Sequence, residues 1–470
     1  MKRFLTVLVT VLVVVVWVFA NQISYAAKVA KPNLIFIMVD DMGKAPVGCY
    51  TGATRDSLTP NIDRLAAGGM KFNNFYSMPQ CTPTRVALLT GQYPFHNGWV
   101  NHYDVPRWNL KGFSPKVYPC VGNVMKSAGY ATCIAGKWQI SDFRREPKIL
   151  NECGFDEFCV WTGGEGGNPL SDRRYWDAYL HTSAGSSTYQ GKFGPDICAD
   201  FLVQFIRDHK DEPFFIYYPM ILVHGPLEES PLERQGKQPP KQQIVPGGPK
   251  GKRGKKRGKT ASVYYMDHLV GRLVAALDES RVRDNTIVIW TTDNGPRKGQ
   301  TVEAGVCQPF VANGPGIVPA KAETDALVDI TDMLPTFAAL GGAKLPTDNK
   351  LDGKSFAPLI LGKSKDSDRQ WIAALGGGAC LREKSTAAPV PGRNATEYRD
   401  RVVRDKSYKL YIGRDRRPQK LAKIANGLEG PNIIDSNEPA DRAALKKLSN
   451  IAANFPAKDS NPRYPNSTRP

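Results

Sequence analysis

The sequence predicts an α/β fold: a large, mostly parallel, doubly wound sheet flanked by helices, followed by a small C-terminal α+β domain with an antiparallel sheet. Apolar runs of strand length recur at residues 33–39, 214–220 and 286–290, as is typical of parallel strands buried on both faces. Segments with helical periodicity lie between these runs. After about residue 364, short strand-like runs separated by polar turns replace the alternation.

The N-terminus has the pattern of a secretory signal over residues 1–27. Lys2 and Arg3 precede an apolar run at 4–20, and small residues at 24–27 offer a cleavage site. The apolar run is long for a signal peptide, so an uncleaved membrane anchor is the alternative. No later stretch is long and apolar enough to span a bilayer, and we expect a secreted or periplasmic protein with no other membrane contact.

The mature chain divides into two expected domains, a large α/β domain at 31–365 and a C-terminal domain with its tail at 366–470. The net charge of +18 is concentrated in the segment 234–259, which has ten Lys or Arg and no acid. We interpret this segment as a flexible basic insertion, either a solvated linker or a device that steers a polyanionic substrate. Nucleic acid is not an expected partner, because no recognition fold accompanies the export signal.

Nine cysteines are present, so an exported chain leaves at least one unpaired. Cys153 and Cys159 are close enough in sequence to form a disulfide, although the connectivity stays open. Neither a CxxC pair nor a histidine-rich cluster indicates zinc.

The large domain begins with the strand at 33–39, which ends at Asp40-Asp41. A helix is expected at 60–67, with Thr59 as N-cap and Gly68-Gly69 after its end. A second helix is expected at 119–128. The short strand at 131–135 leads into Lys137 and Gln139.

Residues 141–196 show weak periodicity, and we interpret them as an excursion that shapes a cleft. Polar side chains follow the next two strands: His224 after 214–220, and Asp293-Asn294 after 286–290. The remaining expected elements are helices at 201–208, 262–278 and 331–340, and C-terminal strands at 371–375, 401–404 and 408–412.

The stretch 77–94 carries a cysteine, a proline and an arginine at fixed offsets. Pro83 suits the first turn of a helix that ends at Gly91. Cys81 would then lie just outside the helix N-terminus, where backbone N–H groups favour an anion. Arg85 would offer a planar fork to a tetrahedral oxyanion. For Cys81 alone, a buried structural cysteine is the alternative.

The polar strand ends predict a metal site if their strands share one parallel sheet, because they then meet at one edge. Asp40, Asp41, Asp293 and Asn294 form an oxygen-only set, which suits Ca²⁺ or Mg²⁺ rather than zinc. Each pair alone is also a common turn or cap sequence. With Arg85, the groups Lys137, His224 and Lys298 would make the site electropositive and suited to a reacting anion.

The motif CTPTR followed by LLTG resembles the signature of the sulfatase family, in which the cysteine is oxidised after synthesis to formylglycine. The resemblance covers residues 31–365 and, weakly, the C-terminal part. Its ordered motifs are highly specific together. They are PNLIFIMVDDMG, TPNIDRLAAGGMKFNNFYS, GKW at 136–138, HGP at 224–226, DNGP at 293–296 and KGQTVEAG at 298–305.

The resemblance implies a calcium-dependent hydrolase, with magnesium as the alternative ion, that acts on an aryl or carbohydrate sulfate. Cys81 would become formylglycine through a maturating enzyme, and its hydrate would attack sulfur and later expel sulfate. The metal would be held by Asp40, Asp41, Asp293, Asn294 and residue 81. Arg85 and Lys137 would steady the nucleophile. His224 and Lys298 would contact the sulfate, and one of them would protonate the leaving oxygen.

Two departures from the family pattern stand out. The family usually has histidine where this chain has Gln139, and glutamine cannot act as a base. We therefore hypothesise that regeneration uses another base or is slow. The family's EGGxRxP is here EAGVCQP, with Ala304 for glycine and Cys307 for arginine. The alternatives are a phosphodiesterase or phosphonate hydrolase of the same superfamily, or a catalytically impaired binder of sulfated glycans.

Overall fold

The computed structural model describes residues 31–470 except 53–55, 241–252, 348–349, 377–399, 426, 458, 461–462 and 464–470. The expected signal at 1–27 and Cys380 lie outside the described residues, as does much of the basic segment 234–259. Within the described part, no helix combines the length and apolarity needed to cross a membrane.

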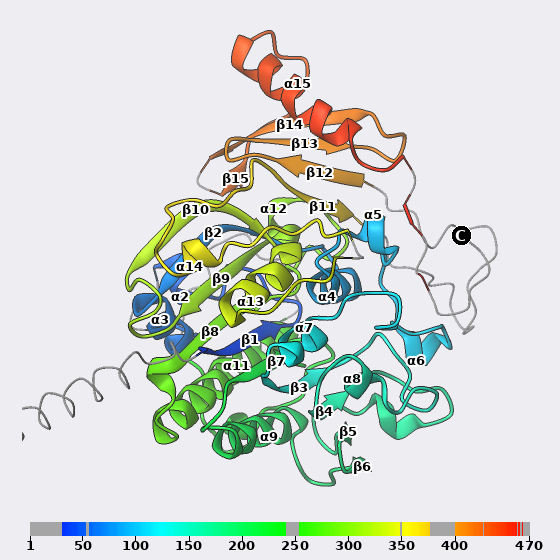
Figure 1. Ribbon diagram of the computed structural model, residues 1–470, viewed down its shortest axis with the longest axis vertical. Helices are drawn as coiled ribbons and strands as arrows, with labels where there is room; N and C mark the ends of the chain where they lie inside the picture. Colours follow the sequence, from blue (N-terminus) through cyan, green and yellow to red (C-terminus); the bar gives the residue numbers. More distant parts are fainter. Residues whose placement is uncertain are drawn as a thin grey trace, which may run out of the picture.

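The large domain is built on a ten-stranded mixed sheet with the strand order β10-β2-β9-β8-β1-β7-β3-β4-β5-β6 (Figure 1). The central strands β8, β1, β7 and β3 are parallel neighbours, which confirms the predicted doubly wound α/β class. The strands are β1 (Asn33–Val39), β2 (Met70–Tyr76), β3 (Ala131–Lys137), β4 (Glu157–Trp161), β5 (Tyr179–Thr182), β6 (Gly185–Thr188), β7 (Phe214–Pro219), β8 (Thr286–Thr292), β9 (Cys307–Asn313) and β10 (Ala322–Asp329).

Strand β1 shows why its apolar run is continuous. Alternate side chains of a strand point to opposite faces, and both faces of this strand are covered. Leu34, Phe36 and Met38 join the hydrophobic cluster on one face, whereas Ile35 and Ile37 join the cluster on the other. The strand is therefore buried over its whole length.

Helices cover both faces of the sheet (Figure 1). The residues of α3, α9 and α11 pack in one cluster, and those of α4, α7 and α13 pack in the other. The helices are α2 (Gly48–Thr51), α3 (Pro60–Ala67), α4 (Cys81–Thr90), α5 (Pro94–Asn97), α6 (Val105–Trp108), α7 (Val121–Ser127), α8 (Ile149–Glu152), α9 (Gly194–Asp208), α10 (Pro231–Arg234), α11 (Arg253–Glu279), α12 (Glu303–Val306), α13 (Met333–Gly341) and α14 (Ala357–Ile360), with 3₁₀ turns at Pro169–Asp172, Arg283–Asn285 and Ile330–Asp332.

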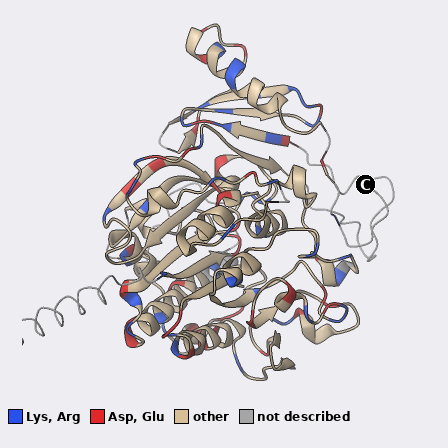
Figure 2. Ribbon diagram, in the orientation of Figure 1, with Lys and Arg blue, Asp and Glu red and all other residues tan. Residues whose placement is uncertain are grey.

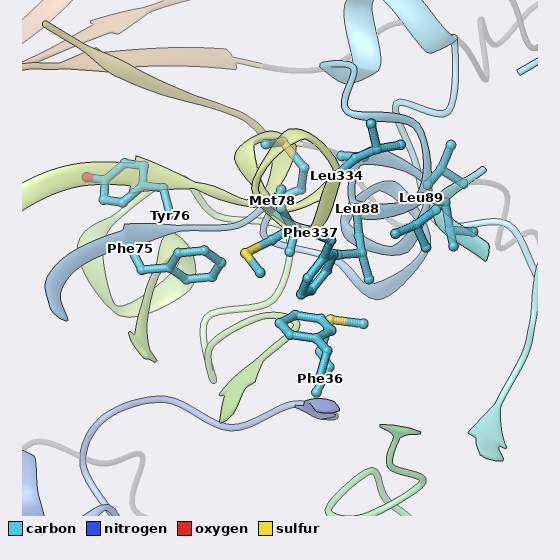
Figure 3. Packing of buried hydrophobic residues seen from close by; sticks show 14 of the residues in the cluster. Phe36, Phe75, Tyr76, Met78, Leu88, Leu89, Leu334 and Phe337 are labelled. Atoms are coloured by element: carbon cyan, nitrogen blue, oxygen red, sulfur yellow. The ribbon is translucent and has the colours of Figure 1, made fainter. Parts of the chain in front are cut away.

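Helix α4 lies deep in the second cluster. Leu88 and Leu89 lie beside Leu334 and Phe337 of α13, with Phe36 of β1 below them (Figure 3). The rings of Phe36 and Phe337 meet edge to face at 5.4 Å. Every residue of α4 is buried, so the helix that carries Cys81 is held rigidly by the core.

The structure adds strands that the sequence did not predict. The segment 141–196, expected to be an excursion, contributes β4, β5 and β6, which extend the sheet. Strand β9 runs antiparallel between β8 and β2. It was missed because Gln308 and Pro309 interrupt its apolar pattern. Gln308 is nevertheless buried, and its side chain pairs with Thr292 Oγ1 and Gly305 O.

The C-terminal region forms the predicted antiparallel sheet, with the order β11-β12-β13-β14-β15 and helix α15 on its outer side (Figure 1). Three strands agree with the prediction to within one residue, whereas β14, β15 and α15 were not predicted. The elements are β11 (Ile372–Gly376), β12 (Asp400–Arg404), β13 (Tyr408–Ile412), β14 (Pro418–Ala425), β15 (Leu428–Glu429) and α15 (Pro439–Ala453).

Charged residues lie mainly on the helices and loops, and the central strands carry few (Figure 2). A group of buried charges joins helix α12 of the large domain to the C-terminal sheet. The Glu303 carboxylate, at the start of α12, is 3.1 Å from Arg404 Nη1 of β12 and 2.9 Å from Lys409 Nζ of β13. The Arg404 and Lys409 side chains are 1% and 0% exposed, so these charges depend on each other.

Replacement of Arg404 by leucine is therefore expected to destabilise the protein by about 3–5 kcal/mol, because it leaves a buried carboxylate under-compensated. Urea unfolding of the two proteins measures the difference. The matched control is Arg207→Leu, which breaks the exposed Arg207–Glu279 pair and is expected to cost at most about 1 kcal/mol. Equal losses in both variants would contradict the prediction.

The described cysteines are all free, so the Cys153–Cys159 pairing that the sequence left open is not formed. Each of the two thiols lies beside a different cysteine. The thiol of Cys153 interacts with that of Cys120, and the thiol of Cys198 interacts with that of Cys159. The two cysteines are close in sequence but apart in space, because Cys153 packs in the cluster on one face of the sheet and Cys159 of β4 in the cluster on the other.

Candidate active site

The candidate site lies at the carboxyl ends of four neighbouring parallel strands. Asp40 and Asp41 follow β1, Asp293 and Asn294 follow β8, His224 follows β7, and Gln139 follows β3, whose last residue is Lys137. Since β8, β1, β7 and β3 are adjacent and parallel, their ends meet at one edge of the sheet, where open α/β folds place ligands. The structure thus brings together every site residue predicted from the sequence.

Cys81 is the first residue of α4, whereas the sequence placed it just outside the helix. Gln80 before it is extended, and Gly91 ends the helix in the left-handed region at φ 66°. The hydroxyl of Thr84 donates to the backbone oxygen of Asp293 at 2.9 Å. This bond ties the first turn of α4 to the end of β8 and brings Cys81 next to the carboxylates.

A group of oxygen ligands surrounds Cys81. One ligand atom each from Asp40, Cys81 and Asp293 lies within 4.8 Å of the others. Among the described residues, Oδ1 of Asp40 and Oδ1 of Asn294 are buried without a hydrogen-bond partner. Unpaired buried oxygens are costly, and a hard cation would satisfy them. The residues present therefore fit a calcium or magnesium ion.

Asp41 occupies the outer side of this group. Its backbone has a positive φ of 57°, which aspartate tolerates better than most residues. Its carboxylate accepts from Asn294 Nδ2 at 2.8 Å and from Lys298 Nζ at 3.0 Å, and lies 3.5 Å from His224 Nε2. The Lys298 ammonium is also 3.4 Å from His224 Nε2. This places Lys298 and His224 together on one side of the carboxylates.

Two buried cations lie on the inner side. Arg85 Nη2 is 2.9 Å from Asp293 Oδ2 and 3.4 Å from Asp40 Oδ2, and Lys137 Nζ is 2.5 Å from Asp40 Oδ2. Burial alone would raise the pKa of Asp40, but Lys137, His224 and Arg85 hold it well below its usual range. Burial and the charge of Asp40 raise the pKa of Asp293 instead. A negative charge on Asp293 is therefore unfavourable beside Asp40 unless a further cation joins Arg85 and Lys137 at the site.

The ionisable groups on the outer side differ in charge. Burial lowers the pKa of His224 to about 4, despite the opposing effect of Asp40, so the imidazole is neutral at neutral pH. Burial alone would lower the pKa of Lys298, but Cys81, Asp41 and Asp40 raise it above its usual value. A cationic lysine and a neutral histidine would together meet an anionic substrate.

The surroundings of the Cys81 thiol include one residue that the sequence did not single out. Sγ is 3.7 Å from Gln139 Oε1 and 3.4 Å from Nδ1 of His102. Burial, with Lys298 and Lys137, lowers the pKa of His102 to about 4. His102 follows no strand and belongs to no motif, so only the fold reveals it.

Lys259 is a second residue that the sequence analysis missed. Its Nζ donates to the backbone oxygen of Asp41 at 3.0 Å, and burial lowers its pKa. In the sequence it is one of many basic residues in the insertion 234–259, and composition could not distinguish it from the others.

The departures at Ala304 and Cys307 are accommodated locally. Lys44 Nζ is 3.1 Å from Cys307 Sγ and 2.7 Å from Asn73 O, so a cation lies beside the cysteine. Gly295, which follows Asp293-Asn294, donates its N–H to Gly305 O at 3.0 Å. A Cβ at Gly295 would lie 2.0 Å from Ala304 O, so this close approach requires glycine.

Comparisons with known proteins agree with this geometry. The model of the sulfatase family matches residues 32–343. Human arylsulfatase A is 33% identical over 383 residues, which cover 72% of this chain and 69% of the relative. Dog N-acetylgalactosamine-6-sulfatase is 28% identical over 377 residues, with 70% and 66% covered. The crystal structure of Ps i-CgsB superposes with a TM-score of 0.73 at 25% identity, covering 92% of this chain and 94% of that one.

The family match spans the residues that build the site, from Asp40 to Lys298, and the first of these relatives is 33% identical over most of its length. The strand order and the C-terminal antiparallel sheet occur within a fold shared with a solved neighbour over nearly the whole chain. On these grounds the chain belongs to the sulfatase family and is a sulfuric ester hydrolase.

Proposed function

We propose that this enzyme hydrolyses a carbohydrate or aryl sulfate, with formylglycine made from Cys81 as nucleophile and a divalent cation beside it. The observation that carries the proposal is the position of Cys81. Its Sγ lies within 4.8 Å of ligand oxygens of Asp40 and Asp293, and Asp40 Oδ1 and Asn294 Oδ1 are buried without partners. A structural cysteine has no need of such neighbours.

The cation would be held by Asp40, Asp41, Asp293 and Asn294, together with the modified side chain at position 81. All of these offer oxygen, and Ca²⁺ accepts such a set with flexible geometry; Mg²⁺ is the alternative. Bound there, the cation would polarise the sulfate oxygens and favour the ionised nucleophile. A formylglycine-generating enzyme is the required partner for maturation.

The remaining residues divide into two groups. Arg85 and Lys137, buried against Asp40 and Asp293, would orient the nucleophile and balance the carboxylates. His224 and Lys298 lie together on the outer side, where they would contact the sulfate group. One of them would donate a proton to the oxygen that leaves with the alcohol.

A sulfated sugar is the substrate class that we favour. The names of the relatives include an N-acetylgalactosamine-6-sulfatase, and the N-terminal signal pattern agrees with action outside the cytoplasm. The basic segment 234–259 would attract a polyanionic chain, and its last residue, Lys259, contacts Asp41 of the site.

The test is a substrate panel for the mature protein made together with a formylglycine-generating enzyme. Sulfated mono- and oligosaccharides, an aryl sulfate, a phosphate diester and a phosphonate monoester are compared by release of sulfate, of a phosphate monoester or of phosphonate, respectively. We expect sulfate release to exceed the other reactions in kcat/KM. Faster cleavage of the phosphorus esters would support the alternative hydrolases, and binding of sulfated sugars without turnover would support a glycan binder.

A further inference from the structure

His102 lies against the side chain from which the nucleophile is made. It belongs to the loop between α5 and α6, and its Nδ1 is 3.4 Å from Cys81 Sγ and 3.4 Å from Thr82 Oγ1. Gln139 Oε1 lies 3.7 Å from the same sulfur. The other histidine of the site, His224, is on the outer side with Asp41 and Lys298. His102 is therefore the imidazole that contacts position 81.

The loop that carries His102 is fixed by hydrogen bonds to two residues near the thiol, Thr82 and Gln139. The Thr82 hydroxyl donates to Tyr103 O at 3.0 Å and accepts from Tyr103 N at 3.1 Å. Val105 N donates to Gln139 O at 3.3 Å. Tyr103 is 7% exposed and packs edge to face on Trp99 with ring centroids 5.2 Å apart. The position of His102 is thus determined by α4, the end of β3 and the aromatic core.

The chemistry of the site requires a proton acceptor at position 81. If sulfate leaves from that residue, the hydroxyl that stays behind has to lose its proton. Gln139, although close, has an amide that does not accept a proton at neutral pH. Arg85 and Lys137 are cations bound to carboxylates and also cannot accept one. Among the described groups within hydrogen-bonding distance of Sγ, an imidazole is the ordinary base.

We propose that His102 is the catalytic base that releases sulfate in this enzyme, in place of an imidazole at position 139. Nδ1 takes the proton from the hydroxyl on residue 81, and the electron pair of that O–H bond forms the C=O bond of the aldehyde. The C–O bond to sulfate breaks, and sulfate leaves with its electron pair. The imidazolium then gives its proton to water. This inference rests on the proposed formylglycine mechanism.

The test compares His102→Gln with the double variant His102→Gln, Gln139→His. Glutamine keeps a polar side chain at 102 but removes the base. We expect kcat for an aryl sulfate to fall about 10²- to 10⁴-fold, as when a general base is lost. The first turnover should persist as a burst of aryl alcohol. After acid quench, the peptide containing residue 81 should retain sulfate, which makes it about 80 Da heavier than the peptide with the hydrated aldehyde. The double variant should recover turnover, because a side chain at position 139 also lies close to residue 81.

His209→Gln is the control, since His209 pairs with Glu157 and Glu212 away from the site and should keep the wild-type kcat. Wild-type turnover in His102→Gln would overturn the proposal. The proposal would also be overturned if His102→Gln lost activity, its residue-81 peptide retained no sulfate, and the double variant did not recover turnover. The failure of the formylglycine mechanism is seen separately, as an unmodified cysteine at position 81 in the active wild-type enzyme.

Discussion

Replacement of Cys81 by alanine is expected to abolish sulfate ester hydrolysis while the protein stays folded. Loss of a nucleophile in a hydrolase lowers kcat by about 10⁴- to 10⁶-fold, and little residual chemistry is left to the other groups. The Cys81 side chain is small and buried at the first turn of α4, so alanine fits the same space. The measurement is kcat for an aryl sulfate together with the thermal unfolding midpoint.

Serine at the same position distinguishes the aldehyde mechanism from a simple nucleophile. A serine hydroxyl can accept a sulfuryl group but has no second hydroxyl from which to expel it. We expect Cys81→Ser to release at most one equivalent of alcohol and then stop. In the wild-type enzyme, the peptide containing residue 81 should be lighter by about 18 Da, the difference between a CH₂SH group and an aldehyde.

The control for this experiment is Cys49→Ala, which removes a half-buried thiol away from the site. It should leave kcat unchanged. Active enzyme that carries unmodified cysteine at position 81, or steady turnover by Cys81→Ser, would contradict the formylglycine mechanism.

Removal of the cation is the second change with a large expected effect. The chelated protein should lose sulfatase activity and unfold at a lower temperature, because Asp40, Asp41 and Asp293 then repel one another. Added Ca²⁺ at 100 times its dissociation constant should increase the free energy of unfolding by about 2.7 kcal/mol. Thermal unfolding with Ca²⁺ and with Mg²⁺ measures this and shows which ion binds more tightly.

The variant Asp293→Asn tests whether the stabilisation by Ca²⁺ arises at this site. Asp293 is fully buried beside Asp40 and Cys81, and asparagine removes one of the charges that would hold the ion. We expect the Ca²⁺-dependent rise in unfolding temperature to shrink or vanish together with activity. Asp196→Asn, which changes a carboxylate paired with Tyr265 and Arg272, should keep the full rise. Equal Ca²⁺ responses in all three proteins would refute a metal site here.

The sequence predicted the part of the fold in which local pattern and tertiary environment agree. Strand β1 and the strands β7 and β8 are buried on both faces, and their continuous apolar runs identify them. Strand β9 was missed because Gln308 and Pro309 break the pattern, and the buried glutamine is satisfied only by Thr292 and Gly305. Helix α9 begins at Gly194, whereas the sequence analysis placed its start at residue 201. The first turns were missed because they carry Gly194, Pro195 and Asp196.

What the sequence by itself determined is the motif around the candidate nucleophile Cys81, the carboxylates at two strand ends and the order of the motifs, because each is encoded in contiguous residues. Only the tertiary structure decided which groups meet them. His102 reaches Cys81 because Thr82 binds the loop at Tyr103. Glu303 of α12 pairs with Arg404 of the C-terminal sheet. Such contacts join residues far apart in the chain, and no local pattern of hydrophobicity or spacing encodes them.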